Sequence, residues 1–216
     1  MMAGRSPKAG TSRFLRGLSL LALTVSVATA FTHTPVGAAG ARFLPQTRNE
    51  PNFTSDLNAQ MRTLWRAITS DSPALGERVF FPRDAYLHMK QGQIPDPAAD
   101  YQDRLVALFA LDVSAYHHLL TTGPGVTFVR VSSAPSDAAW IAPGACENTI
   151  GYWHLPGVRL VFRRGMRIES VRVASLISWR GVWYVVHLGP NPRLANVGTV
   201  DDFHLGAGVP GPAGGC

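Results

Sequence analysis

The stretch that decides the fold is Val171–Leu188, VRVASLISWRGVWYVVHL. Apolar residues alternate on both sides of Arg180 and Gly181, which predicts two antiparallel strands joined by a two-residue turn. Gly181 supplies the positive φ that such a turn needs. The resulting register predicts one face, directed at the core, with four pairs: Trp179 with Val182, Ile177 with Tyr184, Ser175 with Val186, and Val173 with Leu188.

The opposite face of this hairpin mixes apolar and polar residues. Its predicted pairs are Ser178 with Trp183, Leu176 with Val185, and Ala174 with His187. A mixed face is typical of a sheet that is only partly covered. Its apolar residues, Leu176, Trp183 and Val185, form a candidate homodimer surface, because an uncovered apolar sheet face favours association.

Composition and charge narrow the class of protein. The chain has 216 residues, of which 46% are hydrophobic, enough to bury the core of one domain. Four of the 20 basic residues (Arg5, Lys8, Arg13 and Arg16) precede an apolar run, and all 14 acidic residues lie beyond position 49. The remaining chain is therefore nearly balanced in charge. It also lacks a basic stripe interleaved with aromatic residues, so we expect no nucleic-acid partner.

The N-terminal segment is typical of a signal peptide. The apolar run 18–28 follows positive charges and is short for a membrane span. Residues 28–30 (ATA) fit a cleavage site, and residues 37–39 (GAA) are a later alternative. We expect a signal peptide over 1–30, a linker over 31–51, and export to the medium or the cell envelope. An uncleaved run would instead anchor the protein in a membrane. The strong preference for arginine over lysine favours a high-GC bacterial source.

The two cysteines, Cys146 and Cys216, predict one disulfide bridge in an exported protein. A free terminal thiol and an intermolecular bridge are the alternatives. The spacing of the cysteines is not that of zinc ligands. His117 and His118 are adjacent in a predicted helix, so their side chains diverge by about 100°. We therefore expect no metal and no other cofactor.

The first half of the predicted domain is helical. A first helix is predicted from Thr54 or Ser55 to about residue 69, because apolar residues recur at helical spacing between cap and stop residues. A short strand at 78–81 and a helix at 83–90 are predicted to follow. Asp96 and Pro97 predict the start of a longer helix that reaches Leu119. Asp112 interrupts the apolar stripe of that helix. It is expected to cap a separate helix, to line a cavity, or to lie on the surface.

The second half is predicted to be a meander of strands. The expected strands cover 126–131, 138–141, 152–155, 158–163 and 166–179, before the final strand of the hairpin. The apolar positions change parity within the strand from Met166 to Trp179, which predicts a β-bulge near Glu169 or Ser170 and a bent sheet. The predicted fold is α+β over residues 52–190, with N-terminal helices packed on a bent antiparallel sheet. Residues 191–216 are rich in Gly and Pro, which predicts a mobile tail.

This order of elements, ending in SLISWRGVWYVVHLG (175–189), resembles the nuclear-transport-factor-like, or cystatin-like, α+β proteins over about residues 54–190. That group includes ketosteroid isomerases, dehydratases, epoxide hydrolases and many binding proteins without activity. The resemblance implies a pocket between the sheet and the helices, and it carries over no catalytic residue. The phrases FFPRDAYL (80–87) and GYWHLPG (151–157) also resemble uncharacterised exported bacterial proteins.

Five residues are candidates for ligand binding. Isomerases and dehydratases of this kind need a carboxylate or a histidine facing a neutral donor. Asp112 and Tyr116 share one helical face, Tyr86 lies on the short helix, and Trp153 and His154 precede a Pro-Gly break where a loop could present them. We assign no catalytic residue.

These patterns support three hypotheses of function. The leading one is an exported, non-catalytic domain that binds a small apolar ligand or a partner protein. The second is a small isomerase, dehydratase or hydrolase that uses Asp112 with Tyr116 or His154. The third is an anchored structural protein of the cell envelope, bridging partners through its tail.

Overall fold

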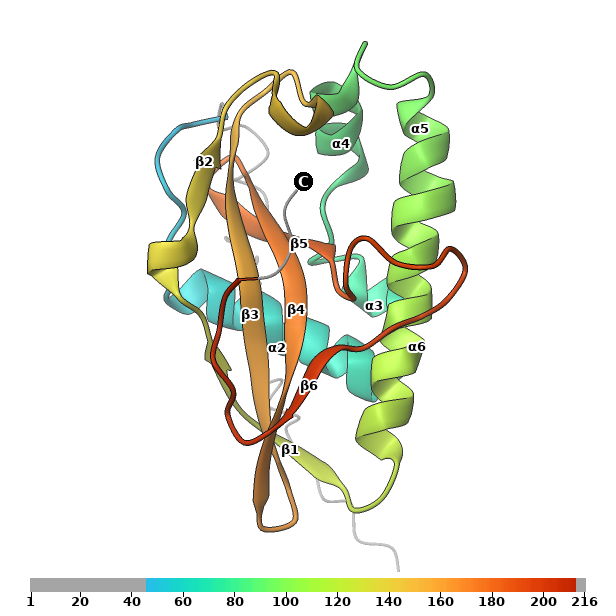
Figure 1. Cartoon of the computed structure of the whole chain (residues 1–216), viewed down its shortest axis with the longest axis vertical. Helices are drawn as coiled ribbons and strands as arrows, with labels where there is room; N and C mark the ends of the chain where they lie inside the picture. The colour runs from blue at the N-terminus through green and yellow to red at the C-terminus, as the bar shows by residue number, and fades with distance from the viewer. Residues whose placement is uncertain (1–45, 213–216) are drawn as a thin grey trace, which may run out of the picture. The chain divides into compact units, whose positions relative to one another are not determined.

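The computed structural model describes residues 46–212 and has an α+β fold, with helices packed against a six-stranded antiparallel sheet (Figure 1). This confirms the predicted fold class. The predicted signal peptide, most of the predicted linker and Cys216 lie outside the described residues. In the part of the chain that is described, no helix has the length and apolar character needed to cross a membrane.

The helices begin and end close to the predicted residues. They are α2 (Ser55–Thr69), α3 (Pro73–Gly76), α4 (Arg83–Lys90), and a continuous helical stretch formed by α5 (Pro97–Ala99), the π-helical segment η1 (Asp100–Val106) and α6 (Ala107–Thr121). Asp96 caps this stretch as predicted, because its carboxylate accepts hydrogen bonds from the backbone N–H groups of Ala98 and Ala99.

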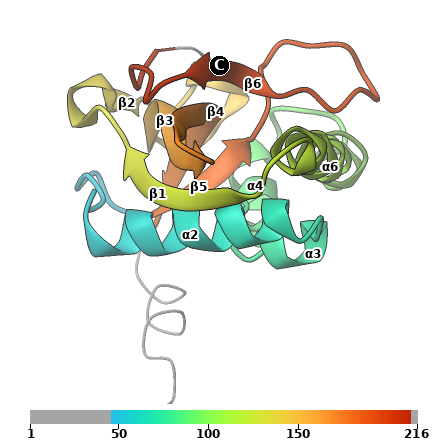
Figure 2. The same ribbon diagram turned by 90° about the horizontal axis from the view of Figure 1, so that it is seen from below.

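Two long strands, β3 (Tyr152–Arg164) and β4 (Arg167–Trp179), form the centre of the sheet. β1 (Val126–Ser132) and β2 (Ala139–Ile141) pair with the outer edge of β3, while β5 (Val182–His187) and β6 (Asp201–Leu205) pair with the other edge of β4. The predicted strand at 78–81 is reduced to a bridge, in which Phe80 pairs with Val185. Figure 2 shows α2 and α3 on one side of the strands and β6 on the other.

The hairpin between β4 and β5 has the predicted turn and, near the turn, the predicted register. Arg180 and Gly181 adopt φ values of 50° and 80°, and Trp179 pairs with Val182. The register then shifts by one residue, because Ser175 pairs with His187. The predicted pairs of Ser175 with Val186, of Ala174 with His187 and of Val173 with Leu188 are therefore wrong. The extra residue lies in β5, and the backbone N–H of Ala174 donates to the carbonyl of Leu188 instead.

The predicted bulge near Glu169 or Ser170 is wrong for β4 itself, which keeps one register along the whole of β3. The irregularity lies in the partner strand β6, where Asp202 takes a φ of 38°. Met166, which sets the changed parity together with Ile168, lies in the turn before β4 and is fully exposed. This part of the sheet is covered by the chain's own C-terminal segment. Ser170 and Arg159 are buried there, and Gly208 lies directly against the Arg159 guanidinium.

The C-terminal segment is structured where a mobile tail was predicted. Its residues 201–205 form β6, and the backbone N–H of Gly211 donates to the carbonyl of Gly157 at 3.0 Å. The predicted break at Pro156 and Gly157 is also wrong, because β3 continues through both residues and Pro156 pairs with Ser175. Gly157 adopts a positive φ of 65°, which lets the strand continue with no side chain against Gly211.

The predicted dimer surface is not exposed. Leu176, Trp183 and Val185 have side chains that are 0–2% exposed, and the ring of Phe53 packs on Trp183 with a centroid distance of 5.4 Å. Phe53 and α2 cover this face, so these three residues belong to the core. Whether the protein forms a homodimer is not tested by this burial.

Candidate binding site

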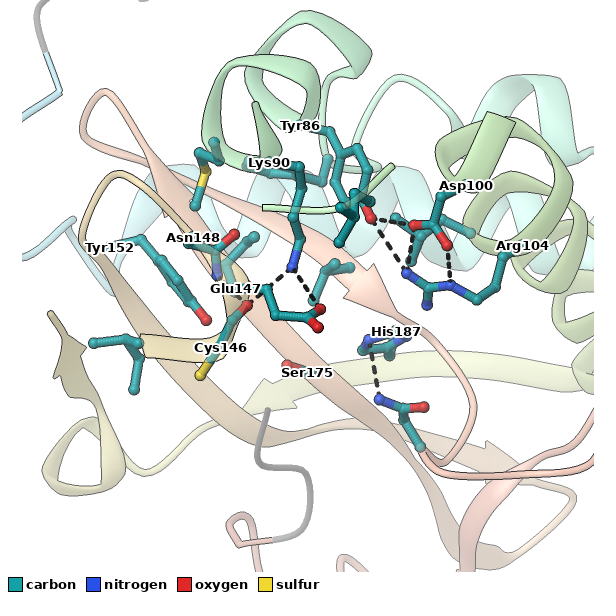
Figure 3. A pocket seen from close by; sticks show the side chains of 18 of the residues that line it. Tyr86, Lys90, Asp100, Arg104, Cys146, Glu147, Asn148, Tyr152, Ser175 and His187 are labelled. Carbon is teal, nitrogen blue, oxygen red and sulfur yellow. Dashed lines mark hydrogen bonds and ion pairs between the residues drawn. The ribbon is translucent and has the colours of Figure 1, made fainter. Parts of the chain in front are cut away.

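A cavity of about 710 Å³ lies between the sheet and the helices α4 and α5–η1 (Figure 3). The loop around the short helix η3 (Ala145–Glu147) closes one side of it. Its walls are largely apolar, formed by Phe81, Met89, Ile94, Leu105, Ile141, Ile177 and Val186.

Helical spacing brings two pairs of polar side chains to this cavity. Tyr86 and Lys90 are four residues apart on α4, and Asp100 and Arg104 are four residues apart on η1. The second pair lies in a π-helical segment, a local geometry that is frequent at functional sites. Each pair therefore projects from one face of its helix toward the same space.

Tyr86, Asp100 and Arg104 form one hydrogen-bonded cluster (Figure 3). Arg104 holds the Asp100 carboxylate with two bonds, Nε to Oδ1 at 2.7 Å and Nη2 to Oδ2 at 2.6 Å, and the Tyr86 hydroxyl donates to the same carboxylate. The Arg104 hydrogen bonds lower the pKa of Asp100. Burial is the main cause that raises the pKa of Tyr86. The cluster is thus an ionised pair with a neutral phenol.

Lys90 extends along the cavity to the η3 loop. Its Nζ donates to the carbonyl of Cys146 at 2.9 Å and lies 3.9 Å from Glu147 Oε2. Burial lowers the pKa of Lys90, and the nearby Glu147 opposes that shift. Lys90 therefore fastens the loop that forms the wall opposite η1.

Three polar side chains from adjacent strands, His154 on β3, Ser175 on β4 and His187 on β5, line the floor of the cavity. We call them the His–Ser–His row. His154 Nε2 lies 2.7 Å from Ser175 Oγ, and His187 Nε2 lies 3.4 Å from Asn191 Nδ2. Burial lowers the pKa of both histidines, that of His187 to about 4. Both rings are consequently neutral near pH 7.

Two of the five predicted ligand-binding residues, Tyr86 and His154, line this cavity. Trp153 does not: its indole Nε1 donates to the Arg48 carbonyl at 2.8 Å and its ring packs on Trp140. This position follows from the alternation of side chains along β3, since Trp153 and His154 are consecutive.

Asp112 also lies outside the cavity. It is a fully buried residue in the middle of α6, so the predictions that it caps a separate helix or lies on the surface are wrong. Its carboxylate pairs with Arg193 and accepts hydrogen bonds from the backbone N–H groups of Gly189 at 2.9 Å and Thr199 at 3.0 Å. Burial raises the pKa of Asp112, and the bond from Arg193 is the largest opposing cause. Asp112 anchors the C-terminal segment to α6.

Tyr116, one helical turn further, holds the same segment. Its hydroxyl accepts from the backbone N–H of Asp201 at 2.9 Å and lies 2.5 Å from the carbonyl oxygen of Arg172. The ring is fully buried, and this burial raises the pKa of Tyr116 well above its usual value. Asp112 and Tyr116 therefore share a helical face, as predicted, but that face binds the chain's own backbone.

Most polar residues of the cavity were not among the sequence-based candidates, among them Lys90, Asp100, Arg104, Ser175 and His187. The spacing of Tyr86 to Lys90 and of Asp100 to Arg104 is a signal that could have indicated the two helical pairs. Within residues 46–212, no group of three His, Cys, Asp or Glu side chains is arranged to hold a metal ion. The predicted Cys146–Cys216 bridge involves a residue outside the described range and stays a prediction.

Compared with protein-family models, with curated proteins and with solved structures, the chain gives no match. The resemblance to nuclear-transport-factor-like proteins therefore stays a prediction, and a fold class alone does not define a function.

Proposed function

We propose that this protein is an exported, non-catalytic domain that binds a small and largely apolar molecule in the cavity between the sheet and α4 and α5–η1. The observation that carries the proposal is the cavity itself. Its volume of about 710 Å³ falls in the range of small-molecule sites, and its apolar walls surround polar groups that converge on the same space. Export is part of the proposal because of the N-terminal sequence.

The pairing of charges supports binding rather than turnover. Asp100 is held by Arg104, and Lys90 is bonded to the η3 loop. The enzyme hypothesis used Asp112 together with Tyr116 or His154, but Asp112 and Tyr116 bind the C-terminal segment, whereas His154 lines the cavity. A tail free to bridge envelope partners is likewise not favoured, because β6 is paired within the sheet.

The test is a titration with N-phenyl-1-naphthylamine, a neutral apolar dye whose fluorescence rises when it leaves water. We expect saturable binding of one dye per chain. The variant Val186→Trp should weaken binding by about tenfold or more, because the larger ring occupies the cavity.

Val182→Trp is the matched control. Val182 lies on the same strand and is also partly exposed, but it does not line the cavity. Equal loss of dye binding in both variants, or no saturable binding to the unmodified protein, would contradict the proposal.

A further inference from the structure

The charged side chains of the cavity are already satisfied by the protein. Asp96 accepts from the backbone N–H groups of Ala98 and Ala99, Asp100 accepts from Arg104, and Glu147 lies near Lys90. The lining contains the carboxylates of Asp96, Asp100 and Glu147 against the cations of Lys90 and Arg104. An anionic ligand would therefore enter a site of net negative charge and compete for cations that are already bonded.

A cationic ligand is no better matched. The Asp100 carboxylate is occupied by Arg104 and by the Tyr86 hydroxyl, and the Asp96 carboxylate caps a helix. Glu147 lies 3.9 Å from Lys90, but its side chain is 69% exposed to water, where an ion pair contributes little. The charged side chains of the site thus disfavour both anionic and cationic ligands.

The His–Ser–His row offers what the charged groups do not. Each histidine uses Nε2 within the protein, His154 toward Ser175 and His187 toward Asn191. Among residues 46–212, neither ring has a hydrogen-bond partner at Nδ1. A neutral imidazole has one donor and one acceptor nitrogen, so each ring keeps one uncharged hydrogen-bonding position for a ligand.

The row lies beside apolar side chains of the same sheet. The apolar Ile177 lies two residues after Ser175 on β4, and the apolar Val186 lies directly before His187 on β5. All four residues line the cavity. A molecule with an apolar body could thus contact these walls while one polar group reaches the histidines. Burying such a group without a partner would cost free energy, and the row supplies the partner.

From this arrangement we infer that the ligand is an uncharged amphiphile, whose hydroxyl or carbonyl group hydrogen-bonds to His154 and His187 while its apolar body fills the cavity. This inference rests on the proposed function, and it names the class of ligand.

The first experiment displaces the bound dye at pH 7.5 with three ligands of one chain length: 1-decanol, decanoate and decylammonium. We expect 1-decanol to displace the dye at about one tenth of the concentration needed for either ion. Equal or better displacement by an ion would overturn the inference. If decanoate won and Lys90→Met abolished its binding, the site would be one for anions held by Lys90.

The second experiment replaces the histidine that lies at the edge of the row. His187→Phe keeps a planar ring and removes both nitrogens, so we expect the affinity for 1-decanol to fall about tenfold while dye binding is retained. His118→Phe, at an exposed position on α6, should change neither. Unchanged 1-decanol affinity in His187→Phe, with dye still bound, would overturn the inference.

The two proposals fail in different ways. If the dye does not bind, or if Val186→Trp weakens dye binding no more than Val182→Trp does, the proposed function fails. If the dye binds in the cavity but an ion displaces it as well as 1-decanol does, only the ligand class is wrong.

Discussion

Among single residues, His187 gives the folded domain a specific sensitivity to acid. Burial and the nearby cations Arg104 and Arg193 lower its pKa to about 4 in the folded protein, against 6.5 for an unperturbed histidine. The unfolded chain therefore binds the proton more tightly. The stability associated with the neutral ring is fully present above pH 6.5 and is lost progressively as the pH falls toward 4.

The unmodified protein should lose unfolding free energy between pH 7.5 and pH 4.5 as His187 takes up a proton. We expect the His187→Gln variant to lose about 2 to 3 kcal/mol less over the same range. Urea unfolding of the ligand-free protein at both pH values measures this difference. His118→Gln, at an exposed site on the same chain, is the control and should leave the pH dependence as it is. A His187→Gln protein that loses as much stability in acid as the unmodified one would show that His187 is not responsible.

The same residue shows the limit of prediction from sequence at this scale. Tyr86 and His154 could be predicted as binding residues because tyrosine and histidine can hydrogen-bond to a ligand. Their places on a predicted helix and beside a predicted strand were also readable from the local sequence. His187 was predicted to lie opposite Ala174 on the mixed face of the hairpin. The one-residue shift in β5 pairs it with Ser175 instead, and no local pattern in the sequence encodes that shift.

Among elements, the segment after β5 is fixed to α6 by Asp112. The carboxylate binds Arg193 and two backbone N–H groups that lie 77 and 87 residues further along the chain. Both members of the ion pair are buried, so removing one charge leaves the other without compensation. Asp112 is thus the residue through which α6 positions the entry to β6.

We expect Asp112→Asn to lower the unfolding free energy by about 3 kcal/mol. Amide hydrogen exchange should accelerate first at Gly189 and Thr199. Ser114→Ala is a control on the exposed side of the same helix, where a single bond to Asp71 is lost, and it should cost about 1 kcal/mol or less. A loss for Asp112→Asn no greater than that of the control would contradict the anchoring role.

Most elements could be predicted because their signals are local. The hairpin of β4 and β5 carries its alternation and its turn residues within 18 positions, and α2, α4 and the start of α5 carry their own stripes and caps. β6 was missed because its partners are distant: Asp201 binds Arg172, and Asp202 binds Arg159. Asp112 was ambiguous for the same reason, since a lone carboxylate on an apolar stripe does not reveal which distant groups it meets.

At the scale of the whole molecule, the C-terminal segment runs from the cavity, across α6, and back along the sheet. It leaves β5 beside His187, crosses α6 at Asp112, pairs with β4 as β6, and reaches Gly157 at residue 211. Cys146 lies on the η3 loop at the cavity wall. The predicted bridge from Cys146 to Cys216 would therefore fasten the end of this segment to the wall of the proposed binding site.

Closing a loop of about 70 residues in this way would remove entropy from the unfolded chain equivalent to about 4 kcal/mol. We expect the unreduced protein to be lighter by two hydrogens than its reduced form, and Cys216→Ser to lower the unfolding free energy by up to that amount. Dye affinity should also fall, because Lys90 binds the Cys146 carbonyl and the loop would lose its tether. Identical masses before and after reduction would exclude the bridge. A bridged protein with unchanged dye affinity in Cys216→Ser would show that α4, through Lys90, is sufficient to hold the cavity wall in place.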